Sequence, residues 1–371
     1  SRRSKMVYKK RNRKNDKWRP ILWNSNWGMG DIQKICKGVK NMATIAQWDV
    51  NNECNLNCKH WRVSEKNDNE KLSLKDAKML LAECWYSGIT MLNLSGGEPF
   101  LRSDIFEILD YAQKFEDIVI TTNGTLLNEE KCKKLFTYKN IKLSISLDGL
   151  EETHDKFRRK KGAFKKVIDI LPLLNKYNIK YAIKYTLSKE TAKDAVELLN
   201  FVAKLGANEF NVRRVIVAGN ANEDMVLSNE EYKNIIRELI QNCRRLNVKF
   251  RTGDPLLIPI FSEVWGIDIE NDDLSKIYAG CQAGDEIIYI DYKGNVGACS
   301  YIPKFADNIK DKSLDEILQT NKLFIDLREY KNKLEGKCNK CTYKMICGGC
   351  RASALALKKS LFAEDPLCLA N

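Results

Sequence analysis

Nine of the thirteen cysteines stand at short spacings that suit metal binding. Two lie near the start of the chain as Cys54-x3-Cys58. Thiolates grouped in this way hold iron–sulfur clusters or zinc ions. The other seven lie in the last third of the chain and are Cys281, Cys299, Cys338, Cys341, Cys347, Cys350 and Cys368.

Composition indicates the compartment in which these thiols exist. Hydrophobic residues make up 44% of the 371 residues, and no apolar run approaches the roughly 20 residues that span a bilayer. The basic N-terminus is not followed by an apolar segment, so we expect a cytoplasmic protein without a membrane partner. In a reducing cytoplasm, grouped cysteines are metal ligands more often than disulfides.

Positive charge is concentrated at the N-terminus, although the whole chain has a net charge of +13. Residues 1–20 hold ten Lys or Arg against Asp16 alone. We interpret residues 1–44 as a basic N-terminal extension that is solvated. An acidic partner, an acidic substrate or nucleic acid is the alternative, but no recognisable nucleic-acid fold follows, so nucleic acid is not expected.

The middle of the chain alternates predicted strands and helices. Alternation of this kind implies parallel pairing through right-handed crossovers, in either an open doubly wound sheet or a partial barrel. The predicted strands cover residues 47–52, 89–94, 118–121, 142–147, 180–186 and 209–215. The predicted helices lie near residues 73–88, 103–115, 127–137, 163–176, 191–205 and 229–246.

In both architectures the loops after the strands carry the reactive groups. The Cys54–Cys58 loop follows the first strand, and the turn Gly96-Gly97-Glu98-Pro99 follows the second. Thr122-Asn123-Gly124 and Asp148-Gly149 follow the third and fourth strands. These four loops are therefore expected to meet at one rim.

The motifs resemble those of the radical S-adenosylmethionine (SAM) enzymes that carry a SPASM domain, over about residues 45–371. The family signature C-x3-C-x2-C stands here as Cys54-Asn-Leu-Asn-Cys58-Lys-His60-Trp61, one thiolate short. Its further motifs match Gly96-Gly97-Glu98, Ser146-Leu-Asp148-Gly149 and His154-Asp155-Lys-Phe-Arg158. The resemblance implies a partial (β/α)6 TIM-like barrel at residues 45–250 and a Cys-rich SPASM-type domain at residues 251–371.

The resemblance also implies a SAM site. A 4Fe–4S cluster held by three thiolates would bind SAM at its open iron and pass it an electron, which gives a 5′-deoxyadenosyl radical. No residue is singled out as catalytic. The expected SAM contacts are Gly96, Gly97 and Glu98 for the amino group, Ser144 or Ser146 for the ribose with Asp148 beside them, and Lys184 and Arg214 for the carboxylate or ribose.

By the same resemblance, the seven C-terminal thiolates hold two auxiliary 4Fe–4S clusters. Cys281, Cys299 and Cys350 would serve one cluster, and its fourth position would be open to substrate or use another ligand. Zinc remains the alternative metal. The second cluster would take Cys338, Cys341, Cys347 and Cys368. Cys36, Cys84, Cys132 and Cys243 fall outside the motifs, and Cys84 and Cys132 are expected to be small core residues.

Trp61 stands where the third thiolate of the SAM cluster belongs. Indole cannot replace a thiolate, because its N–H group is only a donor. Either Trp61 replaces an original cysteine by a deliberate or incidental change, or the chain is a natural variant that lost radical chemistry. As a third explanation, His60 supplies the missing ligand.

The predicted function is a radical SAM oxidoreductase that modifies a peptide or protein side chain, or a tetrapyrrole side chain. Its partners would be that substrate and an external electron donor. One alternative is a non-catalytic iron–sulfur or peptide-binding relic of the family. The other is a zinc-bearing binding module.

Overall fold

The computed structural model describes residues 44–62, 70–265 and 280–370. The basic extension predicted for residues 1–44 lies outside the described residues except for Thr44, and Cys36 lies outside them as well. Among the described residues, no helix is both long and apolar enough to cross a membrane.

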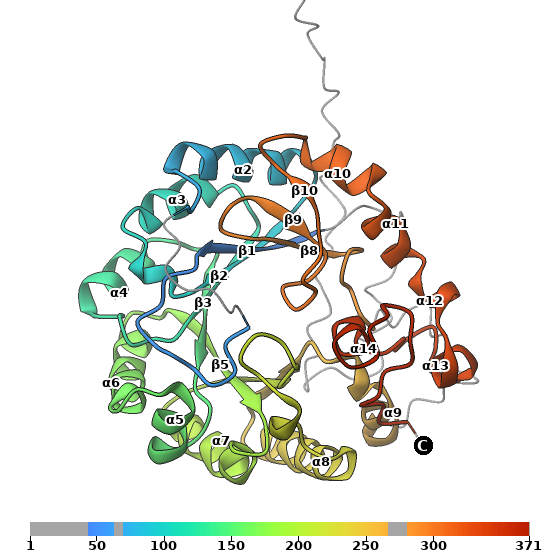
Figure 1. Ribbon diagram of the computed structural model, residues 1–371. Helices are drawn as coiled ribbons and strands as arrows, with labels where there is room; N and C mark the ends of the chain where they lie inside the picture. Colours follow the sequence, from blue (N-terminus) through green and yellow to red (C-terminus); the bar gives the residue numbers. More distant parts are fainter. Residues whose placement is uncertain (1–43, 63–69, 266–279, 371) are drawn as a thin grey trace, which may run out of the picture.

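A parallel sheet forms the centre of the fold, and its strands curve into an open, partial barrel (Figure 1). The six predicted strands are confirmed, with ends that shift by a few residues, and a seventh follows them. Neighbours in sequence are neighbours in the sheet from β1 to β7, the order of a singly wound barrel and not of a doubly wound sheet. The strands are β1 (Ile45–Asn51), β2 (Met91–Gly96), β3 (Asp117–Thr122), β4 (Ile141–Ser146), β5 (Lys180–Leu187), β6 (Glu209–Arg214) and β7 (Lys249–Thr252).

Helices surround this sheet as an outer ring (Figure 1). Each turns an apolar face inward, and Ser73 and Ser228 cap two of them by accepting bonds from the Asp76 and Glu231 N–H groups. The helices are α2 (Leu74–Tyr86), α3 (Ile105–Ala112), α4 (Glu129–Phe136), α5 (Glu151–Arg158), α6 (Ala163–Lys176), α7 (Ala195–Lys204), α8 (Asn229–Arg245) and α9 (Ile258–Trp265).

The C-terminal region continues the same sheet beyond β1. Here β8 (Ile287–Ile290) and β9 (Asn295–Gly297) pair antiparallel, and β10 (Phe305–Asn308) adds to β9. β8 itself pairs parallel with β1, which makes one ten-stranded sheet. The helices of this region are α10 (Leu314–Thr320), α11 (Lys322–Arg328), α12 (Tyr330–Lys333), α13 (Gly336–Lys340) and α14 (Arg351–Lys358).

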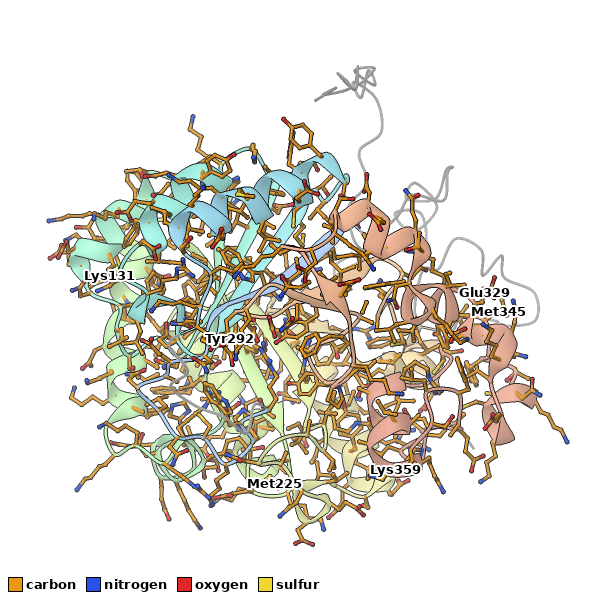
Figure 2. The ribbon with its side chains drawn as sticks, turned by 45° about the horizontal axis from the view of Figure 1, so that its top comes forward. Lys131, Met225, Tyr292, Glu329, Met345 and Lys359 are labelled. Atoms are coloured by element: carbon orange, nitrogen blue, oxygen red, sulfur yellow. The ribbon has the colours of Figure 1, made fainter. Side chains whose placement is uncertain are left out.

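Side chains fill the space between sheet and helices (Figure 2). Glu329, Met345 and Lys359 lie at the periphery of the C-terminal region, where Met345 is 61% exposed. Tyr292, which follows β8, is buried. Most residues of β1, β4 and β5 are buried, whereas β2, β3 and β6 contain both buried and half-buried residues.

A buried arginine fixes the end of β1, where the cysteine loop begins. The Arg102 guanidinium donates to the backbone carbonyls of Val50 and Leu72, both at 2.8 Å, and pairs with Asp104. Val50 is the penultimate residue of β1, and Leu72 lies just before α2. Arg102 therefore ties the start of the first functional loop to the segment that follows it.

The substitution Arg102→Met is expected to lower the free energy of unfolding by about 3 kcal/mol, because it leaves two buried carbonyls without donors. Urea unfolding followed by circular dichroism measures this change. Arg237→Met is the matched control, since Arg237 pairs at the surface with Glu263. It should change stability by less than about 1 kcal/mol. Equal effects of the two substitutions would contradict the assigned role of Arg102.

Candidate functional site

A cavity opens where the parallel strands end at their carboxyl termini. Its empty volume is about 860 Å³, a figure that includes space open to solvent. Its walls come from the loops after β1, β2 and β3, from β4, β5 and β6, and from the C-terminal region. The predicted site residues that line it are Cys54, Cys58, Gly96, Gly97, Ser146 and Lys184.

Hydrogen-bond donors surround the two sulfur atoms of the N-terminal cysteine pair. The Leu56 N–H and the Asn123 amide lie 3.4 and 3.8 Å from Cys54 Sγ, and the Arg158 guanidinium lies 3.6 Å from Cys58 Sγ. Burial raises the pKa of Cys54 to about 12, so the metal-free thiol holds its proton. Metals bind the thiolate, and these donors suit the negative charge that a bound cluster would place on sulfur.

Trp61 belongs to the wall of the same cavity. The backbone N–H of Trp61 donates to the Cys58 carbonyl at 3.3 Å, and its backbone carbonyl accepts from the Asn220 N–H at 2.7 Å. Gly219 packs against that carbonyl, so the backbone at position 61 is held from both sides. The pair Cys54 and Cys58 thus fits a cluster, whereas Trp61 presents an indole that cannot coordinate iron.

His60 also lines the cavity, and its ring stacks on Phe157 with centroids 4.5 Å apart. Burial, with help from the positive charge of Arg158, lowers the pKa of His60 to about 3. The imidazole is therefore neutral. Its Nδ1 atom is buried, with no hydrogen-bond partner among the described residues. A neutral imidazole is chemically able to bind a metal.

The Gly96-Gly97 turn packs directly on the cysteine loop. A Cβ atom on Gly97 would lie 1.8 Å from the Glu53 carbonyl oxygen, and one on Gly96 would lie 2.2 Å from the Asn51 carbonyl oxygen. The φ of Gly96 is +127°, a conformation open to glycine. Hydrogen bonds from the N–H groups of Gly97 and Glu98 to those same two carbonyls close the contact.

Glu98 lies beneath this turn and is fully buried. Its carboxylate accepts from the Thr122 hydroxyl at 2.6 Å, from Asn123 N–H at 2.7 Å and from Phe100 N–H at 3.3 Å. Burial raises the pKa of Glu98 to about 7, against the effect of these donors. The side chain therefore joins the turn after β2 to the loop after β3, and it does not line the cavity.

Asp148 is also fully buried behind the cavity wall, and of the two predicted serines only Ser146 lines the cavity. Asp148 forms an ion pair with Arg158 and accepts from Thr186 N–H at 2.6 Å. Its own N–H donates to His154 Nδ1 at 3.0 Å. The motif residues His154 and Arg158 are thus connected through Asp148, and Arg158 extends the network to Cys58.

Lys184 and Arg214 are placed differently. Lys184 lines the cavity, and burial together with Arg213 and Arg62 lowers its pKa to about 7. Arg214 does not line the cavity, because its guanidinium lies 3.4 Å from Asp254 and donates to a backbone carbonyl near the C-terminus. Its neighbour Arg213 lines the cavity instead, since successive residues of a strand face opposite sides.

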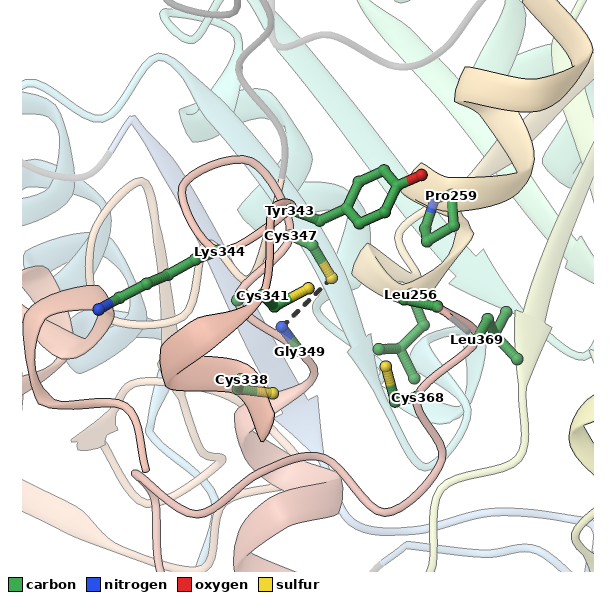
Figure 3. Close-up of a pocket in the computed structure, with 12 residues that line it drawn as sticks. Leu256, Pro259, Cys338, Cys341, Tyr343, Lys344, Cys347, Gly349, Cys368 and Leu369 are labelled. Atoms are coloured by element: carbon green, nitrogen blue, oxygen red, sulfur yellow. Dashed lines mark hydrogen bonds between the residues drawn. The ribbon is translucent and has the colours of Figure 1, made fainter. Parts of the chain in front are cut away.

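Four of the C-terminal cysteines line a second cavity, of about 330 Å³ (Figure 3). They are Cys338, Cys341, Cys347 and Cys368. Their sulfur atoms face the same space, and Gly349 N–H donates to Cys347 Sγ at 3.3 Å. This donor set fits a four-thiolate cluster.

The other three thiols lie near one another. Burial raises the pKa of Cys281 and of Cys299, and it raises that of Cys350 to about 12. A neighbouring thiol raises each of these pKa values further: Cys299 acts on Cys281, Cys350 acts on Cys299, and Cys281 acts on Cys350. Gly348 and Gly349 have φ of +64° and +67°, and this sharp turn separates Cys347 from Cys350. No three His, Cys, Asp or Glu side chains of the described ranges are arranged to hold a single metal ion.

Cys84, Cys132 and Cys243 lie in α2, α4 and α8 and are buried in the hydrophobic core. Sequence reasoning missed Arg213, Ser300 and Tyr301, which line the first cavity. The alternation of residues along β6 could have identified Arg213. The positions of Ser300 and Tyr301 depend on the pairing of β8 with β1, which no local pattern signalled.

Comparison with known proteins identifies the class to which this fold and these cysteines belong. A model of the radical SAM superfamily matches residues 49–202, and a model of the SPASM iron–sulfur cluster-binding domain matches residues 281–342. The AdoMet-dependent heme synthase of Methanosarcina barkeri is 31% identical over 339 residues, which cover 89% of this chain and 97% of the relative. The mycofactocin maturase MftC of Mycolicibacterium smegmatis is 28% identical, with 87% and 81% covered.

Among solved structures, Streptococcus suis SuiB bound to the precursor peptide SuiA has the same fold, with a TM-score of 0.77 and 20% identity over 89% of this chain and 76% of SuiB. The chain belongs to the radical SAM superfamily and carries a SPASM domain. It is an enzyme whose cofactors are SAM and 4Fe–4S clusters.

The substitution Gly97→Ala is expected to destabilise the fold by about 3 kcal/mol, because the new methyl group overlaps the Glu53 carbonyl. Urea unfolding measures this change. Gly253→Ala is the control, since a Cβ there meets only Arg213, at 3.7 Å, and it should alter stability by less than about 1 kcal/mol. If Gly97→Ala were as mild as the control, the two loops would not be packed as described.

Each C-terminal cysteine set is expected to lose its own cluster when one ligand is removed. Cys341→Ala and Cys350→Ala should each lower the iron content of the anaerobically reconstituted chain by about four atoms, and the double variant by about eight. Cys243→Ala is the control and should retain all its iron, because Cys243 lies in the core of α8. Loss of all eight atoms in either single variant would show that the two sets are not separate.

Proposed function

We propose that this chain uses SAM to modify a side chain of a tetrapyrrole. The observation that carries the proposal is the first cavity, which joins the cysteine pair, the Gly96-Gly97 turn and Lys184 on one rim. The tetrapyrrole is favoured because a heme synthase matches the chain over nearly its full length. A peptide side chain is the second candidate, supported by the match to a maturase.

In this proposal each part of the rim has a separate task. Cys54 and Cys58 hold the SAM cluster, Gly96 and Gly97 let the backbone approach the SAM amino group, and Ser146 contacts the ribose. Glu98 and Asp148 act from behind the wall by holding the loops in place, and Ser144 lies within β4, away from the cavity lining. When bound, the cluster and SAM supply the 5′-deoxyadenosyl radical that removes a hydrogen atom from the substrate.

The remaining charged groups control the environment of the cavity. Arg158 donates to Cys58 Sγ and is held by buried Asp148, so it stabilises negative charge on that sulfur. Lys184 binds the SAM carboxylate, and its lowered pKa means that binding weakens as the pH rises above about 7. Arg214 has no place in this SAM site, because Asp254 holds its guanidinium.

The C-terminal cysteines form the two auxiliary clusters of the proposal. Cys338, Cys341, Cys347 and Cys368 supply four thiolates to one, and Cys281, Cys299 and Cys350 supply three to the other. Residues 45–250 then act as the SAM domain and residues 251–371 as the auxiliary cluster domain. An external donor reduces the clusters. Grouped, unpaired cysteines are consistent with a cytoplasmic location.

We further propose that Trp61 stands in place of the third cluster ligand. An indole supplies no lone pair to iron, so only the two thiolates of Cys54 and Cys58 would hold the cluster. This supports the proposal that the cluster is weakly bound. The chain would then retain the SAM pocket and both auxiliary sets while holding its catalytic cluster poorly.

The substitution Trp61→Cys is expected to raise SAM cleavage about tenfold or more, because it completes a three-thiolate set. The measurement is 5′-deoxyadenosine formed under dithionite by anaerobically reconstituted protein. Trp61→Ser is the matched control, since it removes the indole without adding a thiolate. An equal rise in both variants would attribute the effect to space in the cavity, and no rise with cysteine would refute the ligand assignment.

A further inference from the structure

Four cationic side chains line the first cavity: Arg62, Arg158, Lys184 and Arg213. Two of them are neutralised by the protein. Arg62 contacts both carboxylate oxygens of Asp49 at 2.6 Å, and Arg158 pairs with Asp148. Within the described ranges, no carboxylate lies at ion-pair distance from Lys184 or Arg213. The cavity therefore offers two basic side chains, Lys184 and Arg213, with which a bound anion can pair.

Arg213 occupies the side of the cavity that faces the C-terminal region. Its guanidinium lies over the Tyr301 ring, 5.6 Å from the ring centroid. Ser300 lies beside Tyr301 in the same wall, and its Oγ is buried without a hydrogen-bond partner among the described residues. Ser300 directly follows Cys299, so this wall adjoins the set Cys281, Cys299 and Cys350.

Lys184 lies on β5, next to the strand that carries Arg213. In the sheet it is the register partner of Ser146 on β4, and both side chains line the cavity. Arg213 is one strand further on, where it pairs in register with Thr186, two residues beyond Lys184. SAM has a single carboxylate, and Lys184 accounts for it. The charge of Arg213 is then left for a second anionic group.

We propose that Arg213 and Ser300 form a subsite that binds a carboxylate of the substrate, between the SAM site and the Cys281, Cys299 and Cys350 set. A guanidinium binds a carboxylate through two parallel hydrogen bonds, and Tyr301, whose ring lies under the guanidinium, helps to hold it in place. The Ser300 hydroxyl donates a third bond. This assignment rests on the proposed function, because it takes the cavity as the substrate cavity.

The subsite selects substrates by a free carboxylate near the reacting carbon. A tetrapyrrole propionate and an acidic peptide side chain share this chemistry, and amides or esters of either lack it. A site built for a charged group rejects a neutral analogue strongly, because its buried donors would remain unpaired. The carboxylate would also anchor the substrate beside the auxiliary thiolates.

Binding titrations on the anaerobically reconstituted full chain, with SAM present, test the subsite. The tetrapyrrole probe is coproporphyrin III, which has four propionates, and its neutral tetra-amide is the comparison. The peptide probe is a blocked peptide of alternating Gly and Glu, compared with its Gly and Gln counterpart. Arg213→Gln should weaken binding of the acidic probe about tenfold or more and leave the neutral analogue unchanged.

Two further variants separate binding from folding. Arg213→Lys keeps the positive charge but loses the pair of parallel N–H donors, so it should bind the acidic probe with an intermediate affinity. Ser300→Ala should weaken binding of the acidic probe several-fold. It provides the test of the subsite if Arg213→Gln fails to fold. Iron content is measured for each variant, because loss of iron would show that Arg213 supports the auxiliary cluster instead.

The acidic probe that responds identifies the source of the carboxylate. Equal affinities of Arg213→Gln and the unmodified chain for both acidic probes would overturn the subsite, and so would a failure of both probes to bind the unmodified chain. SAM binding is followed in the same samples. If neither the unmodified chain nor Trp61→Cys binds SAM, the proposed function fails, whereas SAM binding with no response at Arg213 refutes the subsite alone.

Discussion

The loop after β1 and the turn after β2 lie so close together that a side chain does not fit between them. At Gly97 even a methyl group would overlap the carbonyl of Glu53. This contact places the cysteine pair at the edge of the cavity, and it explains why two glycines precede Glu98. The buried carboxylate of Glu98 then binds the loop after β3, so three loops are held as one unit.

The cationic side chains around the cavity are of two kinds, those paired with a buried carboxylate and those without such a partner among the described residues. Buried Asp148 holds Arg158 and Asp49 holds Arg62, so each of these cations faces the cavity with its own counter-ion behind it. Lys184 and Arg213 carry charge that the described protein does not neutralise. A cavity lined in this way favours anionic groups. The two sides of the cavity then suit two different carboxylates.

Much of this architecture follows from local sequence patterns. Apolar runs between helical periods predicted the six parallel strands, and the Gly-Gly-Glu turn marked the rim correctly because a close backbone contact requires glycine. Other features depend on contacts distant in sequence. The pairing of β8 with β1 joins segments about 240 residues apart, and it brings Ser300 and Tyr301 to the cavity. Glu98 and Asp148 are buried behind the cavity wall. The sequence pattern does not distinguish such residues from those that line the cavity. Successive residues of β6 face opposite sides, so a shift of one residue decides whether Arg213 or Arg214 lines the cavity.

The proposed chemistry depends on one auxiliary set of four cysteines, a second set of three, and an N-terminal pair beside which Trp61 supplies no thiolate. Counting iron, acid-labile sulfide and zinc in the unmodified, anaerobically reconstituted chain tests this most directly. The account predicts about eight irons with matching sulfide and no zinc, since only the C-terminal sets hold their clusters firmly. About twelve irons would contradict the role given to Trp61, and zinc in place of iron would contradict the account as a whole.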